Sequence, residues 1–377
     1  MDASKRISEM KNFMEENHLK ASIIINFENQ YYLSGFKAIT YSRPVVLVIE
    51  PERTNLIVPA LEEVHAQSEA QADQLYVYYE HPEKSSRGIS YLDHTKSILS
   101  KFAPGSKIGV EFHSLPVKVA YLIKDMGLEL FDIGDKIAEM RYIKDSQEIA
   151  LLQESGRLVS LALSESLKHT QPGMTEIELD SYGNQALFNE TAKKHPNATL
   201  EFFVMSPSGL SRSIMPHVFS NTRQLEEKDI IIHSRQVGLN GYRAECERTL
   251  FVGEPTVEQK NAFQVALEAQ LAALDVIKVG VRAKDVDDAA RKVIRKAGLE
   301  EYAIHRTGHG IGIGLHEEPS LRFDNDLILQ EGMVFSIEPG LYIPGVGGFR
   351  HSDTVILTKE GTKLITDYPK ELKDLIF

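Results

Sequence analysis

The sequence predicts an α/β protein of two domains. Its 377 residues exceed what one ordinary hydrophobic core organises. As far as residue 140, short β runs alternate with helical patterns, which is typical of an α/β layer with a partly parallel sheet. Beyond that residue, two long helical patterns are each followed by a shorter helix and then by strands, which suggests internal duplication. We therefore expect one domain over residues 1–140 and a second over residues 141–377.

The N-terminal domain is expected to support the other domain without a reactive site of its own. Helical patterns cover residues 4–18, 60–72 and 116–126, and β runs cover residues 21–26, 45–49, 56–58, 75–79 and 108–111. No cluster of titratable residues in this half has the composition of an active site.

The C-terminal domain begins with a long helix expected over residues 144–167, with Asp145 as its N-cap. A second helix starts near Thr175, where the sequence has the chemistry of a capping box. The other helix pair is expected at residues 256–277 and 284–297. The strand-rich segments between and after these pairs hold every candidate reactive residue.

Composition excludes several classes of function. The formal net charge of −12 opposes nucleic-acid binding, which requires clustered Lys and Arg. No apolar run reaches the roughly 20 residues that span a bilayer, and the first residues lead into an amphipathic helix and not an apolar signal core. The single cysteine, Cys246, excludes an intrachain disulfide framework and fits a reducing compartment. We expect a cytoplasmic protein with no nucleic-acid or membrane partner.

Residues 305–319 are the most informative part of the chain. This run contains His305, His309 and His316 among closely spaced glycines. Glycine weakens helices and strands, so its repetition marks a place where the backbone approaches something closely. One isolated histidine is more often structural or solvated, but three so close together favour proton transfer or metal binding. The run is predicted to form a catalytic strand and loop.

A predicted hairpin adds two carboxylates to this candidate site. Its turn lies at residues 238–241, and strand alternation then puts Glu245 and Glu247 on one face, with Cys246 on the other. Two carboxylates on one face repel each other if they are buried without a cation, a metal ion or a shared proton. An edge strand with a wet face is the plainer alternative.

Further candidates lie in other strand and loop segments. Glu338 ends an apolar strand directly before a turn, and a polar cluster containing Arg350 and His351 interrupts another strand. His217 lies in a loop, where a histidine could equally well be exposed and inert.

Four motifs follow one another along the second domain. They are Gly-His-Gly-Ile-Gly at 308–312, His-Glu-Glu-Pro at 316–319, Ser-Ile-Glu-Pro-Gly at 336–340 and Gly-Gly-Phe-Arg at 347–350. In this order they resemble the pita-bread family of Xaa-Pro peptidases, methionine aminopeptidases and creatinase. Residues 29–36 and 141–144 resemble the prolidase and creatinase branch, so the resemblance covers nearly the whole chain. It implies a creatinase-like N-terminal α/β domain, a duplicated pita-bread catalytic domain with a central cleft, and a homodimer.

The resemblance also implies a metal site, from which this sequence departs. Metallopeptidases of the family bind two divalent ions through two Asp, one His and two Glu. The matching positions here are Ser234, Glu245, His309, Glu338 and Ser352. Carboxylates fall from four to two, and hard divalent cations need anionic oxygen ligands, so a dinuclear centre is not expected. Glu245, His309 and Glu338 could still hold one Mn, Zn or Co ion.

The expected function is hydrolysis of a C–N bond in a small amino-acid-like or dipeptide substrate, without a dinuclear metal centre. Creatinase is the family's precedent for hydrolysis without metal, and residues 247–251 reproduce the Glu-Arg-Thr-Leu-Phe sequence of its branch. One alternative is a mononuclear metal-dependent Xaa-Pro dipeptidase or aminopeptidase. Another is a non-catalytic pita-bread module that binds a peptide or protein. No cofactor is the first expectation, and one divalent ion is the alternative.

The resemblance and side-chain chemistry together assign roles to the candidates. The expected catalytic residues are His217, Glu245, Glu247, His309 and Glu338. The expected substrate-binding residues are His316, Arg350 and His351. The loop histidine would carry a proton to the leaving nitrogen, and the acids would orient water or a cationic substrate nitrogen. The arginine would bind a substrate carbonyl or carboxylate, for which its guanidinium is suited.

Overall fold

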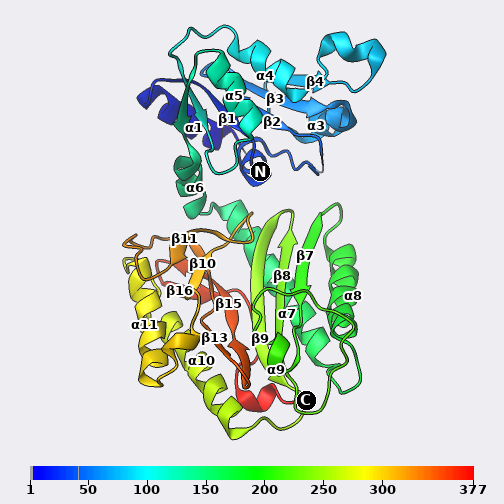
Figure 1. Ribbon diagram of the computed structural model, residues 1–377, viewed down its shortest axis with the longest axis vertical. Coiled ribbons are helices and arrows are strands. Elements are labelled where there is room, and N and C mark those ends of the chain that lie inside the picture. Colours follow the sequence, from blue (N-terminus) through cyan, green and yellow to red (C-terminus); the bar gives the residue numbers. More distant parts are fainter. Residues whose placement is uncertain (1–2, 41) are drawn as a thin grey trace. The chain divides into compact units, whose positions relative to one another are not determined.

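The computed structural model of the chain describes residues 3–40 and 42–377 (Figure 1). It separates into two compact units that divide between Met140 and Arg141. Each unit has its own β-sheet and its own cluster of buried apolar side chains. The predicted α/β architecture is confirmed.

The first unit is built on a six-stranded mixed sheet with strand order β4-β3-β2-β1-β5-β6. Its strands are β1 (Leu19–Ile24), β2 (Val46–Ile49), β3 (Thr54–Pro59), β4 (Gln74–Tyr78), β5 (Lys107–Val110) and β6 (Glu129–Asp132). Strand β2 is antiparallel to β1 and β3, and the pairs β3–β4, β1–β5 and β5–β6 are parallel. The sheet is therefore partly parallel, as predicted.

The helices of this unit include three, α2, α4 and α6, that the sequence did not predict. They are α1 (Ser4–Glu16), α2 (Phe27–Ser34), α3 (Glu63–Glu69), α4 (Tyr91–Leu99), α5 (Val117–Asp125) and α6 (Gly134–Tyr142). Helix α2 was missed because most of its residues are buried, so it has no polar face to give a periodic pattern. The helix expected over residues 60–72 is shorter and is preceded by a 3₁₀ turn, Ala60–Glu62.

The second unit contains two helix pairs. The first pair is α7 (Ser146–Leu167) and α8 (Glu176–Lys194), and the second is α10 (Val257–Val276) and α11 (Ala283–Lys296). Asp145, Thr175 and Thr256 each cap a helix through a capping box, because each side chain accepts from the third residue of the helix. Each pair is followed by strands, so the predicted duplicated layout is confirmed.

An eight-stranded sheet joins the two halves of this unit, with the order β11-β10-β12-β15-β9-β8-β7 and β16 paired to β15. Its strands are β7 (Leu200–Met205), β8 (Ile230–Leu239), β9 (Tyr242–Phe251), β10 (Gly308–Gly310), β11 (Glu317–Leu321), β12 (Val334–Ile337), β15 (Ser352–Thr358) and β16 (Gly361–Leu364). Strands β13 (Gly340–Ile343) and β14 (Gly347–Arg350) form a separate pair, and α9 (Gly209–Arg212) is a single turn. All strand pairs described in this unit are antiparallel.

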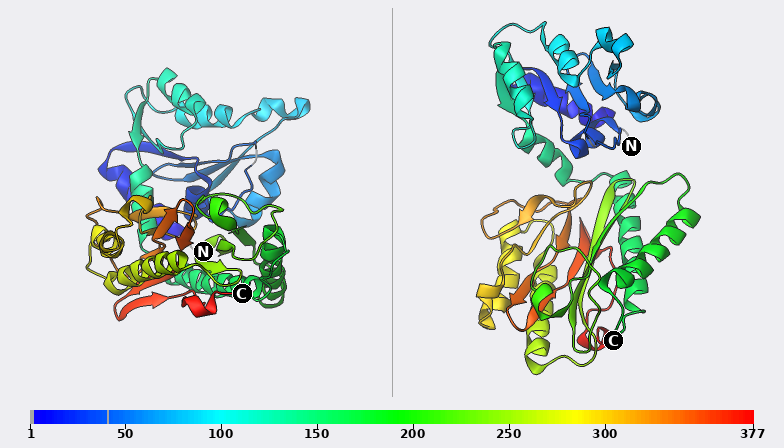
Figure 2. Two further views of the ribbon diagram at one scale, coloured as in Figure 1. Left: turned by 60° about the horizontal axis from the view of Figure 1, so that its bottom comes forward. Right: turned by 45° about the vertical axis from the view of Figure 1, so that its right-hand side comes forward.

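The helices of the second unit bury one face of this sheet. Both views in Figure 2, like Figure 1, show α7 and α8 beside β7–β9, and α10 and α11 beside the strands of the second half. The apolar core contains side chains from α7, α10, β8, β9 and β15. Within residues 3–40 and 42–377, no helix is both long enough and apolar enough to cross a bilayer. The polar residues considered next lie on the sheet face opposite this core.

Candidate active site

The β8–β9 hairpin places two buried carboxylates on the polar face of the sheet. Both residues of its turn, 240–241, have positive φ, as a tight two-residue hairpin turn requires. The register pairs Ser234 with Glu247. Glu245 and Glu247 lie together, whereas Cys246 belongs to the apolar core on the opposite face. The alternation predicted for this strand is confirmed.

Glu245 is buried, and its carboxylate accepts three hydrogen bonds from uncharged side chains. Ser336 Oγ donates to Oε1 at 2.6 Å, and Ser352 Oγ donates to the same oxygen at 2.7 Å. Gln236 Nε2 donates to Oε2. Buried carboxylates require such partners, and here hydroxyl and amide groups supply them.

Glu247 is held by Arg350, which connects it to two further side chains. Arg350 Nε donates to Glu247 Oε2 at 2.5 Å and Nη2 donates to Oε1 at 2.7 Å, a bidentate pair. Its Nη1 donates to Tyr342 Oη at 2.9 Å. His305 Nδ1 donates to the Arg306 carbonyl, so its Nε2 accepts from Tyr342 Oη at 2.9 Å. Burial raises the pKa of Glu247 to about 7, although Arg350 opposes this rise.

His309 forms an ion pair with Glu338. Its Nδ1 donates to the Gly310 carbonyl at 2.9 Å, which leaves Nε2 facing Glu338 Oε1 at 3.3 Å. Among the residues described, Nε2 has no hydrogen bond of good geometry, so the contact is mainly electrostatic. Burial alone would lower the pKa of His309, but Glu338 raises it to about 9. The Glu338 carboxylate therefore favours the protonated form of His309.

A cavity of about 380 Å³ lies beside this ion pair. Its lining includes His217, His305, His316, Arg306, Arg322, Arg350 and Glu338. The ring centroids of His217 and His316, both exposed, are 6.5 Å apart. The His316 ring lies 4.2 Å from that of buried His309. Histidines, guanidinium groups and the Glu338 carboxylate therefore converge on one cavity.

His351 is the predicted site residue that lies elsewhere. Its ring is fully buried and makes an edge contact with Phe263 of α10, with 4.7 Å between the ring centroids. Burial lowers the pKa of His351 to about 3, so the ring is neutral. The expected contact between His351 and the substrate is therefore wrong. His351 points to the helix-covered face of the sheet, whereas its neighbour Ser352 points to Glu245 on the opposite face.

The sequence did not identify several residues that complete the cluster. Ser336 and Gln236 hold Glu245, while Tyr342 links Arg350 to His305, which the histidine run had already indicated. One signal was available: Ser336 lies two residues before Glu338 in a strand, and alternation directs both side chains to the same face. Gln236 could have been found from the hairpin register, since it pairs with Glu245.

Two groups of side chains have the spacing of metal ligands. One ligand atom each from Glu245, His309 and His316 lie within 4.8 Å of one another, and the same holds for Glu245, Glu247 and Glu338. The expected set of Glu245, His309 and Glu338 is divided between these two groups. In the first group, the Nδ1–carbonyl hydrogen bond of His309 fixes its ring so that Nε2 is the atom offered to a ligand.

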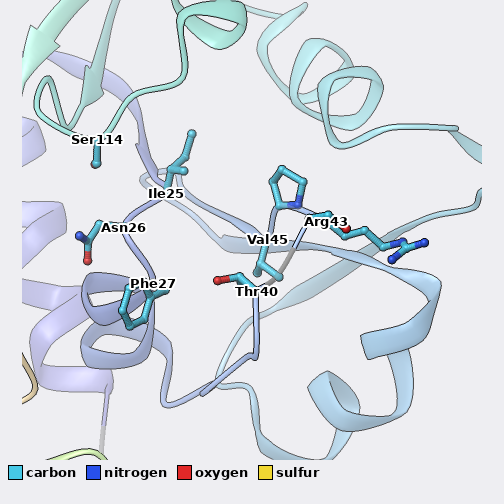
Figure 3. Close-up of a pocket in the computed structure, with 9 residues that line it drawn as sticks. Ile25, Asn26, Phe27, Thr40, Arg43, Val45 and Ser114 are labelled. Carbon is cyan, nitrogen blue, oxygen red and sulfur yellow. The ribbon is translucent and has the colours of Figure 1, made fainter. Parts of the chain in front are cut away.

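The N-terminal unit has a separate pocket of about 360 Å³. Figure 3 shows Ile25, Phe27, Thr40, Arg43 and Val45 around it, together with Asn26 and Ser114. Its one charged side chain, Arg43, is paired with Glu80. Among the described residues that line it, none is an acid, a histidine or a thiol that could activate water or act as a nucleophile.

The site in the second unit has the composition of a hydrolase, because the Glu338 carboxylate and three histidines line a cavity, and further buried carboxylates lie close to Glu338. Comparison with known proteins gives its family. Residues 150–359 match metallopeptidase family M24, and residues 6–143 match the creatinase/prolidase N-terminal domain. The chain belongs to this pita-bread family and is a hydrolase that acts on C–N bonds.

Relatives match over nearly their whole length. The chain is 31% identical to a putative dipeptidase, YkvY, of Bacillus subtilis, covering 97% of this chain and 99% of that protein. It is 30% identical to an Xaa-Pro dipeptidase of Pyrococcus horikoshii, covering 98% and 99%. The solved prolidase structure from Pyrococcus horikoshii superposes with a TM-score of 0.86 at 29% identity, covering 98% of this chain and all of that one. Both domains of the fold inferred from sequence motifs are therefore confirmed.

Proposed function

We propose that this chain hydrolyses the C–N bond of a small amino-acid-like or dipeptide substrate without a dinuclear metal centre. Xaa-Pro dipeptides are the first substrates to test, because relatives that match over nearly the whole chain are named for that activity. One observation carries the metal-related part of the proposal. Glu247 is neutralised by Arg350, Glu338 by His309, and Glu245 is held by uncharged donors.

The chain's own side chains supply the chemistry of hydrolysis. The His309 cation lies where it can stabilise negative charge that develops on the substrate carbonyl oxygen. Glu245 and Glu338 orient water or a cationic substrate nitrogen. Water adds to the carbonyl carbon and gives one proton to exposed His217, which passes it to the leaving nitrogen as the C–N bond breaks. Histidine is suited to this transfer because it exchanges protons near neutral pH.

A pair of divalent ions fits this donor set poorly. Two of the five positions aligned with the family's ligands are the hydroxyl residues Ser234 and Ser352, and Ser352 already donates to Glu245. Arg350 balances the charge of Glu247, and His309 balances the charge of Glu338. Of the three carboxylates, only Glu245 has no cationic side chain paired with it among the described residues. Two divalent ions would bring four positive charges to it, without the anionic oxygen ligands that such ions require.

A single ion is the second candidate, because Glu245, His309 and His316 offer one close set of ligand atoms. One carboxylate and two neutral imidazoles suit one transition-metal ion such as Zn, Mn or Co, which would add Lewis-acid activation of water. Because a metal-bound imidazole is neutral, Glu338 would then no longer face a positive charge on His309. This candidate is a mononuclear dipeptidase.

Turnover of a panel of Xaa-Pro dipeptides, with and without EDTA, tests the proposal. We expect hydrolysis that survives EDTA, and a fall in kcat of roughly 10²- to 10⁴-fold in His217→Ala. Activity that EDTA abolishes and one added ion restores would favour the mononuclear candidate. If no C–N substrate is hydrolysed while His217→Ala still binds a peptide or protein partner, the non-catalytic module gains support.

Restoring the family's ligands tests the metal argument from the opposite side. In Ser234→Asp combined with Ser352→Glu, two carboxylates return to the aligned positions, and we expect Mn-dependent dipeptidase activity to appear. If the activity of this double variant equals that of wild type and does not depend on added Mn, Ser234 and Ser352 do not determine metal dependence.

A homodimer and a cytoplasmic location remain proposals. The homodimer rests on the family resemblance, and the location rests on the single buried cysteine, Cys246. Analytical ultracentrifugation tests the first, and fractionation of cells expressing the native chain tests the second.

A further inference from the structure

The histidine to which the proposed function assigns proton transfer lies in a long loop. Residues 206–221, called the His217 loop below, follow β7 and contain the single turn α9 (Figure 1). The His217 ring is exposed, and its contact with the His316 ring is loose, with 6.5 Å between the ring centroids. Among the described residues, no hydrogen bond holds the imidazole of His217. The place of this ring therefore depends on how the backbone of the loop is held.

Glu176, the first residue of α8, binds both arms of the His217 loop. On the first arm, Ser208 N and Ser208 Oγ donate to Glu176 Oε1 at 2.8 and 2.6 Å. On the second arm, Asn221 N donates to Oε2 at 2.9 Å. The Glu176 side chain is fully buried, so water does not compete for these hydrogen bonds. One carboxylate outside the cavity thus joins the two arms of the loop.

Arg212 extends the contact of Glu176 toward the catalytic histidine. Its Nε donates to Glu176 Oε1 at 3.1 Å and its Nη2 donates to Oε2 at 2.9 Å, a bidentate pair. The same Nη2 donates to the Phe219 carbonyl at 2.9 Å. Phe219 is two residues after His217, so the ion pair fixes the backbone close to the histidine. In all, the Glu176 carboxylate accepts five hydrogen bonds from the loop.

The loop also packs tightly against a strand beside the cavity. Gly348 N donates to Ser213 Oγ at 3.1 Å, and a Cβ on Gly348 would lie 1.9 Å from the Ser213 carbonyl oxygen. Gly348 belongs to β14, whose last residue, Arg350, lines the cavity. The loop is therefore held by Glu176 on one side and by β14 on the other, and His217 lies in the stretch between these two contacts.

We propose that Glu176 is a positioning residue for hydrolysis, which holds the His217 loop so that the imidazole reaches the leaving nitrogen. The proposal rests on the function proposed above, in which His217 takes a proton from water and gives it to that nitrogen. Glu176 is not among the residues that line the cavity, so it acts through the loop. Proton transfer depends steeply on the distance between donor and acceptor, so a small displacement of the loop slows the reaction more than it weakens substrate binding.

Glu176→Gln tests this role in the full chain. The variant removes the charge and replaces one accepting oxygen with an amide that donates, so one arm of the loop loses its acceptor. We expect kcat for Ala-Pro to fall roughly 10- to 100-fold, with KM within about threefold of wild type. Amide hydrogen exchange, measured by mass spectrometry without substrate, should become faster in residues 206–221.

A double-mutant cycle with His217→Ala separates positioning from a general structural role. If Glu176 acts through His217, then Glu176→Gln should lower kcat by less than about twofold in the His217→Ala background. An equal fall of kcat in both backgrounds would overturn the proposal, because the effect of Glu176 would not pass through the histidine.

Glu178→Gln is the matched control, since Glu178 lies in the same turn of α8 but caps the helix instead of binding the loop. Its carboxylate accepts from Thr175 N at 2.6 Å and from Thr175 Oγ1 at 2.8 Å. This variant should leave loop exchange unchanged and kcat within about twofold of wild type, and equal effects of Glu178→Gln and Glu176→Gln would overturn the proposal.

Arg212→Gln tests the same role if Glu176→Gln does not fold. It removes the ion pair and the bond to Phe219 but keeps the bonds from Ser208 and Asn221 to Glu176. We expect kcat to fall roughly 3- to 10-fold and exchange to become faster near Phe219. Wild-type kcat and exchange in this variant would contradict the proposal.

The positioning role and the hydrolase function fail differently. If loop exchange in Glu176→Gln equals that of wild type, the positioning role is wrong whatever the turnover. If loop exchange becomes faster but wild type hydrolyses no C–N substrate, the hydrolase function fails, whereas the anchoring of the loop by Glu176 stands.

Discussion

At the scale of single residues, His351 is a polar side chain that is buried without a polar contact. Neither of its ring nitrogens has a hydrogen-bond partner among the described residues, and the ring packs edge-on against Phe263. A buried group without partners is destabilising by roughly 1–3 kcal/mol. Here the imidazole acts as a small aromatic ring.

Replacing this ring is therefore expected to stabilise the chain. His351→Phe keeps an aromatic side chain against Phe263 and should raise the free energy of unfolding by roughly 1–2 kcal/mol at pH 7.5. The folded pKa is lowered from its ordinary value of 6.5 to about 3. Titration of His351 therefore does not lower the free energy of unfolding of wild type above pH 6.5. As the pH falls toward 3, that free energy decreases, and the loss is about 2 kcal/mol at pH 5.

Urea denaturation of wild type and His351→Phe at pH 7.5 and pH 5 measures this effect. The advantage of the variant should grow as the pH is lowered, because phenylalanine cannot be protonated. A variant that is less stable than wild type at both pH values would show that the histidine has a polar role.

A second residue-scale prediction concerns the hydroxyl that holds Glu245. Ser352→Ala removes the 2.7 Å bond to Oε1 and leaves one serine and one amide as donors. We expect kcat for the best dipeptide to fall roughly tenfold, the effect of one charged hydrogen bond, with little change in the urea midpoint. Full activity in this variant would mean that the hydroxyl only fills space.

At the scale of elements, the glycine-rich run owes its composition to close approach within the protein. A Cβ on Gly308 would lie 2.2 Å from the Ser336 carbonyl oxygen. A Cβ on Gly312 would lie 2.8 Å from Glu317 Oε2 and 3.0 Å from Lys144 Cε. The sequence predicted the close approach correctly, but the partners are a neighbouring strand and a buried ion pair.

Glu317 anchors the loop that carries His316. Its carboxylate accepts from Arg141, from Lys144 Nζ at 3.2 Å and from Gly314 N at 2.7 Å. Burial alone would raise the pKa of Glu317, but Lys144 and Arg141 lower it to about 2. The carboxylate is therefore charged throughout the physiological range, and the residues that resemble the prolidase branch at 141–144 hold the active-site loop.

Glu317→Gln leaves two cations facing a neutral amide. We expect a loss of roughly 3–5 kcal/mol in the free energy of unfolding, as for other broken buried ion pairs, and a higher KM because the His316 loop is released. Glu331→Gln is the matched control: Glu331 is half-exposed and 3.5 Å from Lys359, so its loss should change stability by less than about 1 kcal/mol. Equal effects of the two variants would contradict the anchoring role.

At the scale of the whole molecule, periodicity, capping chemistry and motif order were sufficient to predict both domains and most of the polar residues that the structure brings together in the candidate site. Alternation in β9 placed Glu245 and Glu247 correctly because hairpin register leaves little freedom. The same principle was not applied to His351, which follows Arg350 and therefore faces the helices. Tyr342 could not be recognised, because its contact with Arg350 depends on the pairing of β13 with β14, which leaves no pattern in the sequence.

The proposed function requires that the chain neutralise the carboxylates of the candidate site with its own side chains and not with two metal ions. The most direct test is the metal content of fully active protein, purified without chelator, measured per chain by inductively coupled plasma mass spectrometry alongside dipeptide turnover. We expect at most one divalent ion per chain, and activity that does not rise as a second equivalent of Mn, Zn or Co is added. Two ions per chain, with activity that depends on the second, would contradict it.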